Sequence, residues 1–283
     1  MYVSTVALGA CGGCEASLLA AGEPLVSLLS EHDIGFSSLL VDRRSITPSD
    51  VVLMSGCVRN AEELRLAEEV ARTSRKIVAV GTCAVYGGVA GLRRLEIERS
   101  QDEDVLPRVF AEARPLDQVM SVEMYVPGCP PPTGILFETV KALMEGVQPL
   151  RHDATVCSEC DRRVARRGPA RAVSSSSGPA SGEGVCLLNE SLLCLGPVTR
   201  GGCNASCPSV GTVCSGCRGP SDAVLSSQLH SLYSDMVSCV ARTTGARRDK
   251  VAAQVEGMLD VVYTYTACDP VAMFKVRGKV PRG

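Results

Sequence analysis

GVCLLNESLLCLGPVTRGGCNASCPSVGTVCSGCRGP, residues 184–220, is the stretch around which the 283-residue chain is organised. It holds six cysteines: Cys186, Cys194, Cys203, Cys207, Cys214 and Cys217. Glycine and proline recur throughout, which argues against a regular helix or strand. Few of its side chains are suited to fill a core, so we expect it to stay folded only if something cross-links it.

The cysteines of the whole chain fall into groups. Three pairs have the spacing CxxC, one has CxxxC, two cysteines lie between pairs, and two lie in the contexts GTC and PGCPPP. These twelve are Cys11, Cys14, Cys83, Cys129, Cys157, Cys160, Cys186, Cys194, Cys203, Cys207, Cys214 and Cys217. Three sets of four thiolates suit either three tetrahedral zinc sites or three cubane iron–sulfur clusters.

Composition bounds the class of protein. Hydrophobic residues make up 45% and charged residues 21% of the chain, as in globular proteins, and the net charge of −2 gives no indication of a nucleic-acid partner. No apolar run is long enough to span a membrane, and the N-terminal apolar stretch is too short for a signal peptide. We therefore expect a cytoplasmic protein, in which cysteines serve as metal ligands more often than as disulfides.

Strand and helix signals alternate over residues 1–150. Short apolar runs predict strands at 2–8, 36–41, 51–54, 77–80 and 122–126. Helical spacing predicts a helix over 15–29, interrupted at Pro24, a capped helix from Asn60 to about residue 74, and a third helix over 134–145. This alternation predicts a parallel sheet with helices on both faces, followed by a second domain over 151–283 with helices at 223–240 and 249–262.

Four of the cysteines follow predicted strands. Cys11 and Cys14 come after the first strand, Cys83 after the strand at 77–80, and Cys129 after the last. In an open parallel sheet, ligand sites lie beyond the carboxyl ends of the strands. We therefore expect these four thiols to gather at one edge of the sheet.

Three motifs of the first half resemble the small subunit of nickel–iron hydrogenases. They are CGGCEASL (11–18), GTCAVYGGVAGLRRL (81–95) and VPGCPPP (126–132). The corresponding subunit of respiratory complex I is similar in this half only. The second half carries CSEC (157–160), CLLNESLLCLGPVTRGGC (186–203) and CPSVGTVCSGCRGP (207–220), which also resemble hydrogenase small subunits. The resemblance is greatest to the cytosolic methyl-viologen-reducing type, which pairs with heterodisulfide reductase in methanogens.

The resemblance implies a fold and a set of clusters. The fold is a flavodoxin-like doubly wound sheet followed by an irregular iron–sulfur domain with a few helices. Three 4Fe–4S clusters are implied: a proximal one on Cys11, Cys14, Cys83 and Cys129; a distal one on Cys157, Cys160, Cys186 and Cys194; and a medial one on Cys203, Cys207, Cys214 and Cys217. The resemblance also implies that the partner large subunit oxidises H2 at its nickel–iron site, and that electrons pass through the clusters to a small iron–sulfur or flavin acceptor such as heterodisulfide reductase.

Some residues depart from the family pattern or stay open. Ser55-Gly56 stands where relatives usually have Glu-Gly, which motivates a second hypothesis: a redox relay whose large partner lacks nickel. Glu15 is a candidate for proton transfer or for stabilising the first turn of its helix. Oxygen-tolerant relatives have extra cysteines at the positions of Gly13 and Gly88, where this chain has glycine. The loop at residues 99–118 is also shorter than in close relatives.

The remaining expectations concern cofactors and the three thiols outside the quartets. Without GxGxxG we expect neither flavin nor nicotinamide, and a third hypothesis for the chain is a zinc-stabilised scaffold. We expect Cys57 and Cys239 to be core residues and Cys268 to be a free thiol.

Overall fold

The computed structural model describes residues 1–43, 45–92, 109–149, 153–165, 173–174, 184–226 and 231–268. The chain divides into two compact units. The first consists mainly of Met1–Leu150 with Tyr265–Asp269, and the second mainly of Arg151–Thr264.

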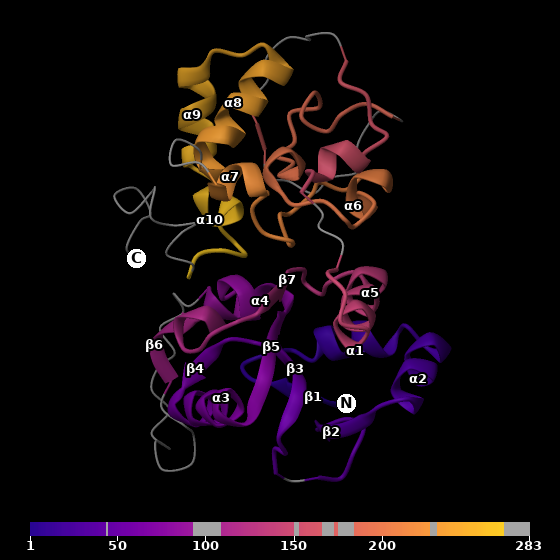
Figure 1. The fold of residues 1–283 in the computed structure, drawn as a ribbon. Coiled ribbons are helices and arrows are strands. Elements are labelled where there is room, and N and C mark those ends of the chain that lie inside the picture. Colours follow the sequence, from indigo (N-terminus) through magenta and orange to yellow (C-terminus); the bar gives the residue numbers. More distant parts are fainter. Residues whose placement is uncertain are drawn as a thin grey trace. The chain divides into compact units, whose positions relative to one another are not determined.

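The first unit contains a five-stranded sheet with the strand order β2-β1-β3-β5-β7 (Figure 1). All its neighbouring strands pair in parallel. The strands are β1 (Tyr2–Ala7), β2 (Asp33–Ser37), β3 (Ser49–Ser55), β5 (Ser74–Val80) and β7 (Met124–Val126). This order is that of flavodoxin-like folds, so the predicted α/β class and parallel sheet are confirmed.

Helices cover both faces of this sheet, as Figure 1 shows for α3 on one side and α1 and α5 on the other. Alternate residues of β3 explain this: Val51 and Leu53 enter one core with side chains of α1, α2 and α5, while Val52 and Met54 enter another with those of α3 and α4. The helices are α1 (Gly13–Leu19), α2 (Glu23–Ser30), α3 (Ala61–Thr73), α4 (Gly81–Tyr86) and α5 (Thr133–Met144), with 3-10 turns η1 (Val89–Gly91) and η2 (Leu116–Gln118).

The local signals for helix ends are confirmed with small changes. Pro24 lies in the first turn of α2, so it restarts the helix as expected. Asn60 caps α3 by accepting from the N–H groups of Glu62 and Glu63, at 3.0 and 2.9 Å. The side chain of Glu63 accepts from the N–H of Arg59 rather than from that of the cap residue.

Two predictions for strands were wrong or incomplete. Residues 38–41 of the strand predicted at 36–41 lie outside the sheet, with 38–40 in a turn, and β2 ends at Ser37. The structure also contains an antiparallel pair, β4 (Val58–Asn60) with β6 (Val109–Arg114), which the hydrophobic pattern did not indicate. This pairing joins segments some fifty residues apart, so no local pattern marks it.

The second unit has one hydrophobic core that includes the cysteine-rich stretch. Leu187, Leu193 and Leu195 are buried there beside residues of the C-terminal helices. The expectation that residues 184–220 have little to pack was therefore wrong, because its leucines cover one side of the helices. The only regular pieces described between Gly184 and Pro220 are η4 (Gly196–Val198) and α6 (Ser206–Ser209).

The C-terminal helices are shorter than predicted. In place of helices at 223–240 and 249–262, the described elements are α7 (Asp222–Ser226), α8 (Leu232–Thr244), α9 (Arg248–Glu256) and α10 (Leu259–Val262). Ser231 starts α8 anew as its capping residue. The Ser231 hydroxyl accepts from the N–H of Ser234, and the Ser234 hydroxyl accepts from the N–H of Ser231, both at 3.0 Å.

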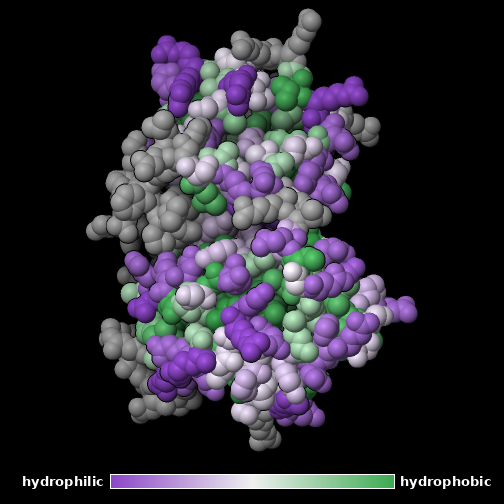
Figure 2. Space-filling view, viewed as in Figure 1, coloured by the Kyte–Doolittle hydropathy of each residue, from purple (hydrophilic) through white to green (hydrophobic). Residues whose placement is uncertain are grey.

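Charged and polar residues dominate the face of the molecule shown in Figure 2, with hydrophobic side chains between them. In the first unit, large hydrophobic residues that remain exposed include Val26 and Leu39. None of the described helices has the length and hydropathy needed to cross a bilayer.

Candidate functional site

Hydrogen bonds between loops bring four cysteines together at the carboxyl edge of the sheet. The Ser17 hydroxyl of α1 donates to the carbonyl of Pro131 at 2.6 Å, which joins the loop of Cys14 to that of Cys129. Thr82 exchanges two bonds of 2.9 Å with Gly128, which joins the loop of Cys83 to that of Cys129. Cys14 consequently lies within the electrostatic reach of Cys11, Cys83 and Cys129.

Burial and crowding raise the pKa values of two thiols in this first quartet, those of Cys14 and Cys83. Burial raises the pKa of Cys14 to about 12, and the Glu15 carboxylate and the other three thiols add to the effect. Burial also raises the pKa of Cys83, although the backbone N–H groups of Ala90 and Val89 oppose it. Such thiols hold protons unless a cation replaces them, which is the environment of a buried metal site.

Glycine is required beside two of these sulfurs. A Cβ built at Gly88, whose φ is +56°, would lie 2.7 Å from the Sγ of Cys83 and 2.8 Å from its backbone nitrogen. Gly81, with φ +87°, leaves the space that the Sγ of Cys14 occupies. The loop motif GTCAVYGG therefore shapes the site as much as its cysteine does.

The second quartet lines a small hollow in the second unit. Cys157, Cys160, Cys186 and Cys194 all contribute to its lining. The residue Cys157 is exposed overall, but its thiol faces this hollow. Burial raises the pKa of the Cys157 thiol to about 12, and the other three thiols add to the effect.

A parallel bridge and one arginine hold the loops of this hollow. Arg163 accepts from the N–H of Cys186 at 2.9 Å and donates its own N–H to Gly184 at 2.7 Å. The guanidinium of Arg162 donates to the carbonyls of Pro208 and Val185, at 2.6 and 2.9 Å. These bonds fix the spacing of Cys160 and Cys186.

The third quartet is only partly gathered by the contacts of the structure. Cys214 is buried near Cys217, and burial followed by the Cys194 thiol raises the pKa of Cys214. Cys203 and Cys217 lie close to the guanidinium of Arg218. Cys207 is exposed and lies in the short helix α6, one turn after Cys203.

The second and third quartets are joined directly. The backbone N–H of Cys214 donates to the Sγ of Cys194 at 3.3 Å, and the carbonyl of Cys214 accepts from Leu195 at 2.8 Å. Gly196 lies beside both quartets, since a Cβ there would be 3.3 Å from the Sγ of Cys157 and 3.8 Å from the Cβ of Cys214.

Two charged residues near the third quartet were not identified from the sequence. The carboxylate of Glu159, from within the CSEC motif, accepts from the N–H groups of Gly202 and Cys203, the latter at 3.1 Å. Arg218 is buried directly after the CSGC motif. Their position inside cysteine motifs is the signal that could have singled them out.

Glu15 and Ser55 form a pair at the edge of the sheet. The Ser55 hydroxyl donates to Oε1 of Glu15, whereas Oε2 of Glu15 is buried and has no partner among the described residues. Glu15 also lies in the first turn of α1. Ser55, which stands where we expected a glutamate from the family resemblance, thus binds the carboxylate of Glu15.

The three remaining cysteines are held in different ways. Cys57 is fully buried, as expected, and its backbone pairs with Gly9 beyond the end of β1. Cys239 is only half-buried, so it is not the core residue expected, and it accepts from Arg242 at 3.3 Å. Cys268 donates its thiol hydrogen to the carbonyl of Gly91 at 3.0 Å and is therefore packed in place.

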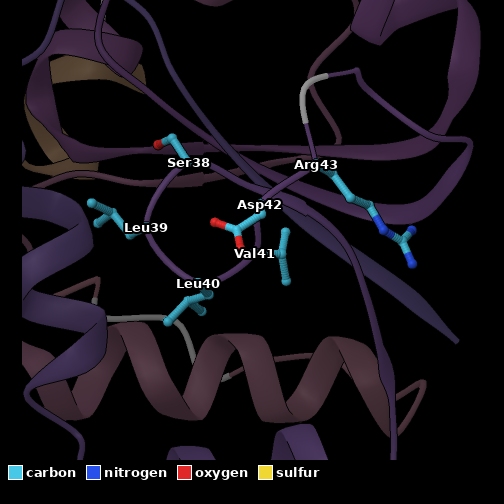
Figure 3. Close-up of a pocket in the computed structure, with 6 residues that line it drawn as sticks. All are labelled: Ser38, Leu39, Leu40, Val41, Asp42 and Arg43. Atoms are coloured by element: carbon cyan, nitrogen blue, oxygen red, sulfur yellow. The ribbon is translucent and has the colours of Figure 1, made fainter.

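A larger surface hollow at the loop after β2 carries no comparable chemistry. It is lined by consecutive residues from Ser38 to Arg43. In Figure 3 their side chains fan out in different directions; Leu39 and Arg43, for example, point to opposite sides. Because polar groups do not converge there, the cysteine quartets are the stronger site candidates.

The comparisons with known proteins agree with the cysteine motifs. The sequence model of the family described as NADH ubiquinone oxidoreductase, 20 Kd subunit, matches residues 11–143. The G subunit of the F420-non-reducing hydrogenase of Methanothermobacter marburgensis is 30% identical over 98% of this chain and 97% of its own length. The sulfhydrogenase 2 subunit delta of Pyrococcus furiosus is 32% identical over 78% of this chain and 87% of its own.

Solved structures support the fold. An actinobacterial-type NiFe-hydrogenase chain from Ralstonia eutropha H16 superposes with a TM-score of 0.55 at 18% identity, over 87% of this chain and 90% of that one. A [NiFeSe] hydrogenase chain from Desulfovibrio vulgaris Hildenborough gives 0.52 at 16% identity, over 81% and 96%. The chain therefore belongs to the family of nickel–iron hydrogenase small subunits, which includes the small subunits of F420-non-reducing hydrogenases.

Proposed function

We propose that this chain is the electron-transfer subunit of a nickel–iron hydrogenase, an oxidoreductase acting on H2 whose nickel–iron site lies on a large partner subunit. The proposed ligands are the proximal, distal and medial cysteine quartets. When bound, three 4Fe–4S clusters would supply one-electron carriers, and so a conduction path. The proposed acceptor is a small iron–sulfur or flavin protein, with heterodisulfide reductase as the first candidate, in the cytoplasm.

The observation that carries the proposal is the convergence of four cysteines from separate loops of the second unit on one hollow, that of the distal quartet. The proximal quartet is similar, since three separate loops contribute to it. Burial among other thiols is unfavourable for thiolates without a cation, and bound iron would supply that charge. The donor set thus fits the group.

Sulfur ligands suit both zinc and iron–sulfur clusters, and the kinship with hydrogenase subunits favours clusters. Within the described ranges, no three His, Cys, Asp or Glu side chains lie close enough to share one metal ion. A zinc ion needs all four ligands around one point, about 2.3 Å from each sulfur. A cubane takes each thiolate on a different iron atom, so it accepts a more open quartet.

The residues of the chain have distinct parts in this function. The loop ties at Ser17, Thr82 and Arg162 position the ligands, and the buried hydrophobic residues around them exclude water. Glu15, with a buried carboxylate oxygen that has no partner among the described residues, is suited to hold a proton at Oε2 and pass it on.

A second candidate is a redox relay whose large partner lacks nickel. It is favoured by Ser55, because this residue bonds to Glu15 within the chain and supplies no second carboxylate. The sequence of the partner discriminates the two: paired CxxC motifs at both of its ends indicate a nickel–iron site, and their absence indicates a relay.

The test is to purify the complex without air and measure iron, acid-labile sulfide and H2-dependent dye reduction. Three cubanes require about twelve irons per chain. The variant Cys83→Ser should lose about four irons and block electron transfer, whereas Cys57→Ser, a buried thiol outside the quartets, should lose no iron. Full iron content and full dye reduction in Cys83→Ser would refute the assignment, and a high zinc content would support a scaffold instead.

A further inference from the structure

Arg218 is a buried cation, and two of its donor atoms lack a partner in the described part of the chain. Only 2% of the residue is exposed. Its Nε and Nη1 atoms are buried and have no hydrogen-bond partner among the described residues. An arginine buried in this way is unfavourable unless its charge and N–H groups meet acceptors. The surroundings of the guanidinium therefore indicate what is meant to lie beside it.

Those surroundings include two thiols of the medial quartet. Arg218 directly follows Cys217, and the charges that attract its guanidinium are, in order, those of Cys203, Cys217 and Glu159. The chain turns sharply here, since the N–H of Gly219 donates to the carbonyl of Gly216 at 2.9 Å and both glycines have positive φ. This turn holds Arg218 inside the unit, next to the ligands.

The carboxylates nearby are engaged elsewhere. Glu159 accepts from the N–H groups of Gly202 and Cys203. Asp222 pairs with the guanidinium of Arg200, a second cation whose charge acts on Arg218. Neither of these bonds uses Arg218, so neither carboxylate satisfies its buried Nε and Nη1 donors.

We propose that Arg218 tunes the medial cluster: its N–H groups donate to sulfur of the medial site, and its charge raises the reduction potential there. This inference rests on the proposed function, because it requires a cluster on Cys203, Cys207, Cys214 and Cys217. A nearby cation stabilises the reduced state, which carries one more negative charge, and hydrogen bonds to sulfur act in the same direction. Arg218 is thus a positioning residue that acts on electron transfer through the cluster.

The test is a redox titration of the whole complex with dithionite and mediators, followed by low-temperature electron paramagnetic resonance. Cys207→Ala, which removes one medial ligand, identifies the medial signal. Arg218→Met should lower the equilibrium constant for one-electron reduction of that signal at least tenfold, a shift of about 59 mV. Arg218→Lys, which keeps the charge, should shift it less, and the other two signals should stay unchanged. The matched control is Arg247→Met, an exposed arginine of the same unit paired with Asp249.

The outcomes separate this inference from the proposed function. An unchanged medial potential in Arg218→Met, at full iron content, overturns the role of Arg218 and leaves the clusters in place. A wild-type complex without a medial signal overturns the proposed function itself. If Arg218→Met loses the medial iron, the iron content and the same titration of Arg218→Gln and Arg218→Lys distinguish a requirement for charge from a packing role. Retention of iron by Lys but not by Gln supports a requirement for charge, and loss in both shows that Arg218 serves packing instead.

Discussion

Replacing Glu159 should destabilise the second unit by an amount that the structure allows us to work out. Its carboxylate accepts two backbone N–H groups, those of Gly202 and Cys203, and Gly201 approaches so closely that a Cβ there would lie 2.7 Å from Oε1. Hydrogen bonds to charged groups contribute about 1.5–3 kcal/mol each. Glu159 is half-buried, so water replaces part of this in a variant. We expect Glu159→Ala to cost about 2–3 kcal/mol, and Glu159→Gln, which keeps an acceptor oxygen, about half as much.

Thermal unfolding of the complex under anaerobic conditions measures this effect. For a unit of this size, 1 kcal/mol corresponds to about 4 °C, so Glu159→Ala should lower the unfolding temperature of the second unit by about 8–12 °C. The matched control is Asp161→Asn, an exposed carboxylate two residues away. If Glu159→Ala and Asp161→Asn unfold within about 2 °C of each other, the two hydrogen bonds do not hold the medial loop.

Three further predictions concern the first unit. Gly88→Ala should displace Cys83 and remove about four irons per chain, because its Cβ would lie 2.7 Å from the Cys83 sulfur, whereas Gly134→Ala, with open space around it, should lose none. Burial raises the pKa of Cys57 to about 12 from 9.0, so the unfolded chain releases this proton first and stability falls as pH rises above 9. At pH 10 the free energy of unfolding should be lower by about 1.4 kcal/mol. Unfolding measured at about pH 8 and pH 10 checks this loss, which Cys57→Ala should abolish. Glu15→Gln should keep the iron and slow H2-dependent turnover about a hundredfold, and unchanged turnover would exclude proton transfer through Glu15.

The sequence predicts the parallel sheet well because its strands carry their own signal. In β3 and β5, branched residues such as Val51, Val52 and Val78 are buried on both faces and form continuous apolar runs. In β2 the signal is hidden: Gly35 is a weak strand former, and it is needed because a Cβ there would lie 2.7 Å from the hydroxyl of Ser4. The apolar residues Leu39 and Leu40 that follow were mistaken for the strand, although they form an exposed turn.

The cysteines could be grouped from their spacing, but their surroundings could not. Strand ends predict that Cys11, Cys14, Cys83 and Cys129 lie together, and the structure has them close to one another; their role as ligands stays a prediction. Burial of Arg218 and the reach of Glu159 depend on how irregular loops cross, which no periodicity encodes. The packing of Leu187 and Leu193 on the helices was missed for the same reason.

The bond from the Cys214 N–H to the Cys194 sulfur has a consequence for maturation of the protein. A sulfur of one quartet and the backbone of another share a single interaction, so ordering either loop organises its neighbour before any iron reaches it. Insertion of the proposed distal and medial clusters should then be cooperative, and chains carrying one of them without the other should be scarce during assembly.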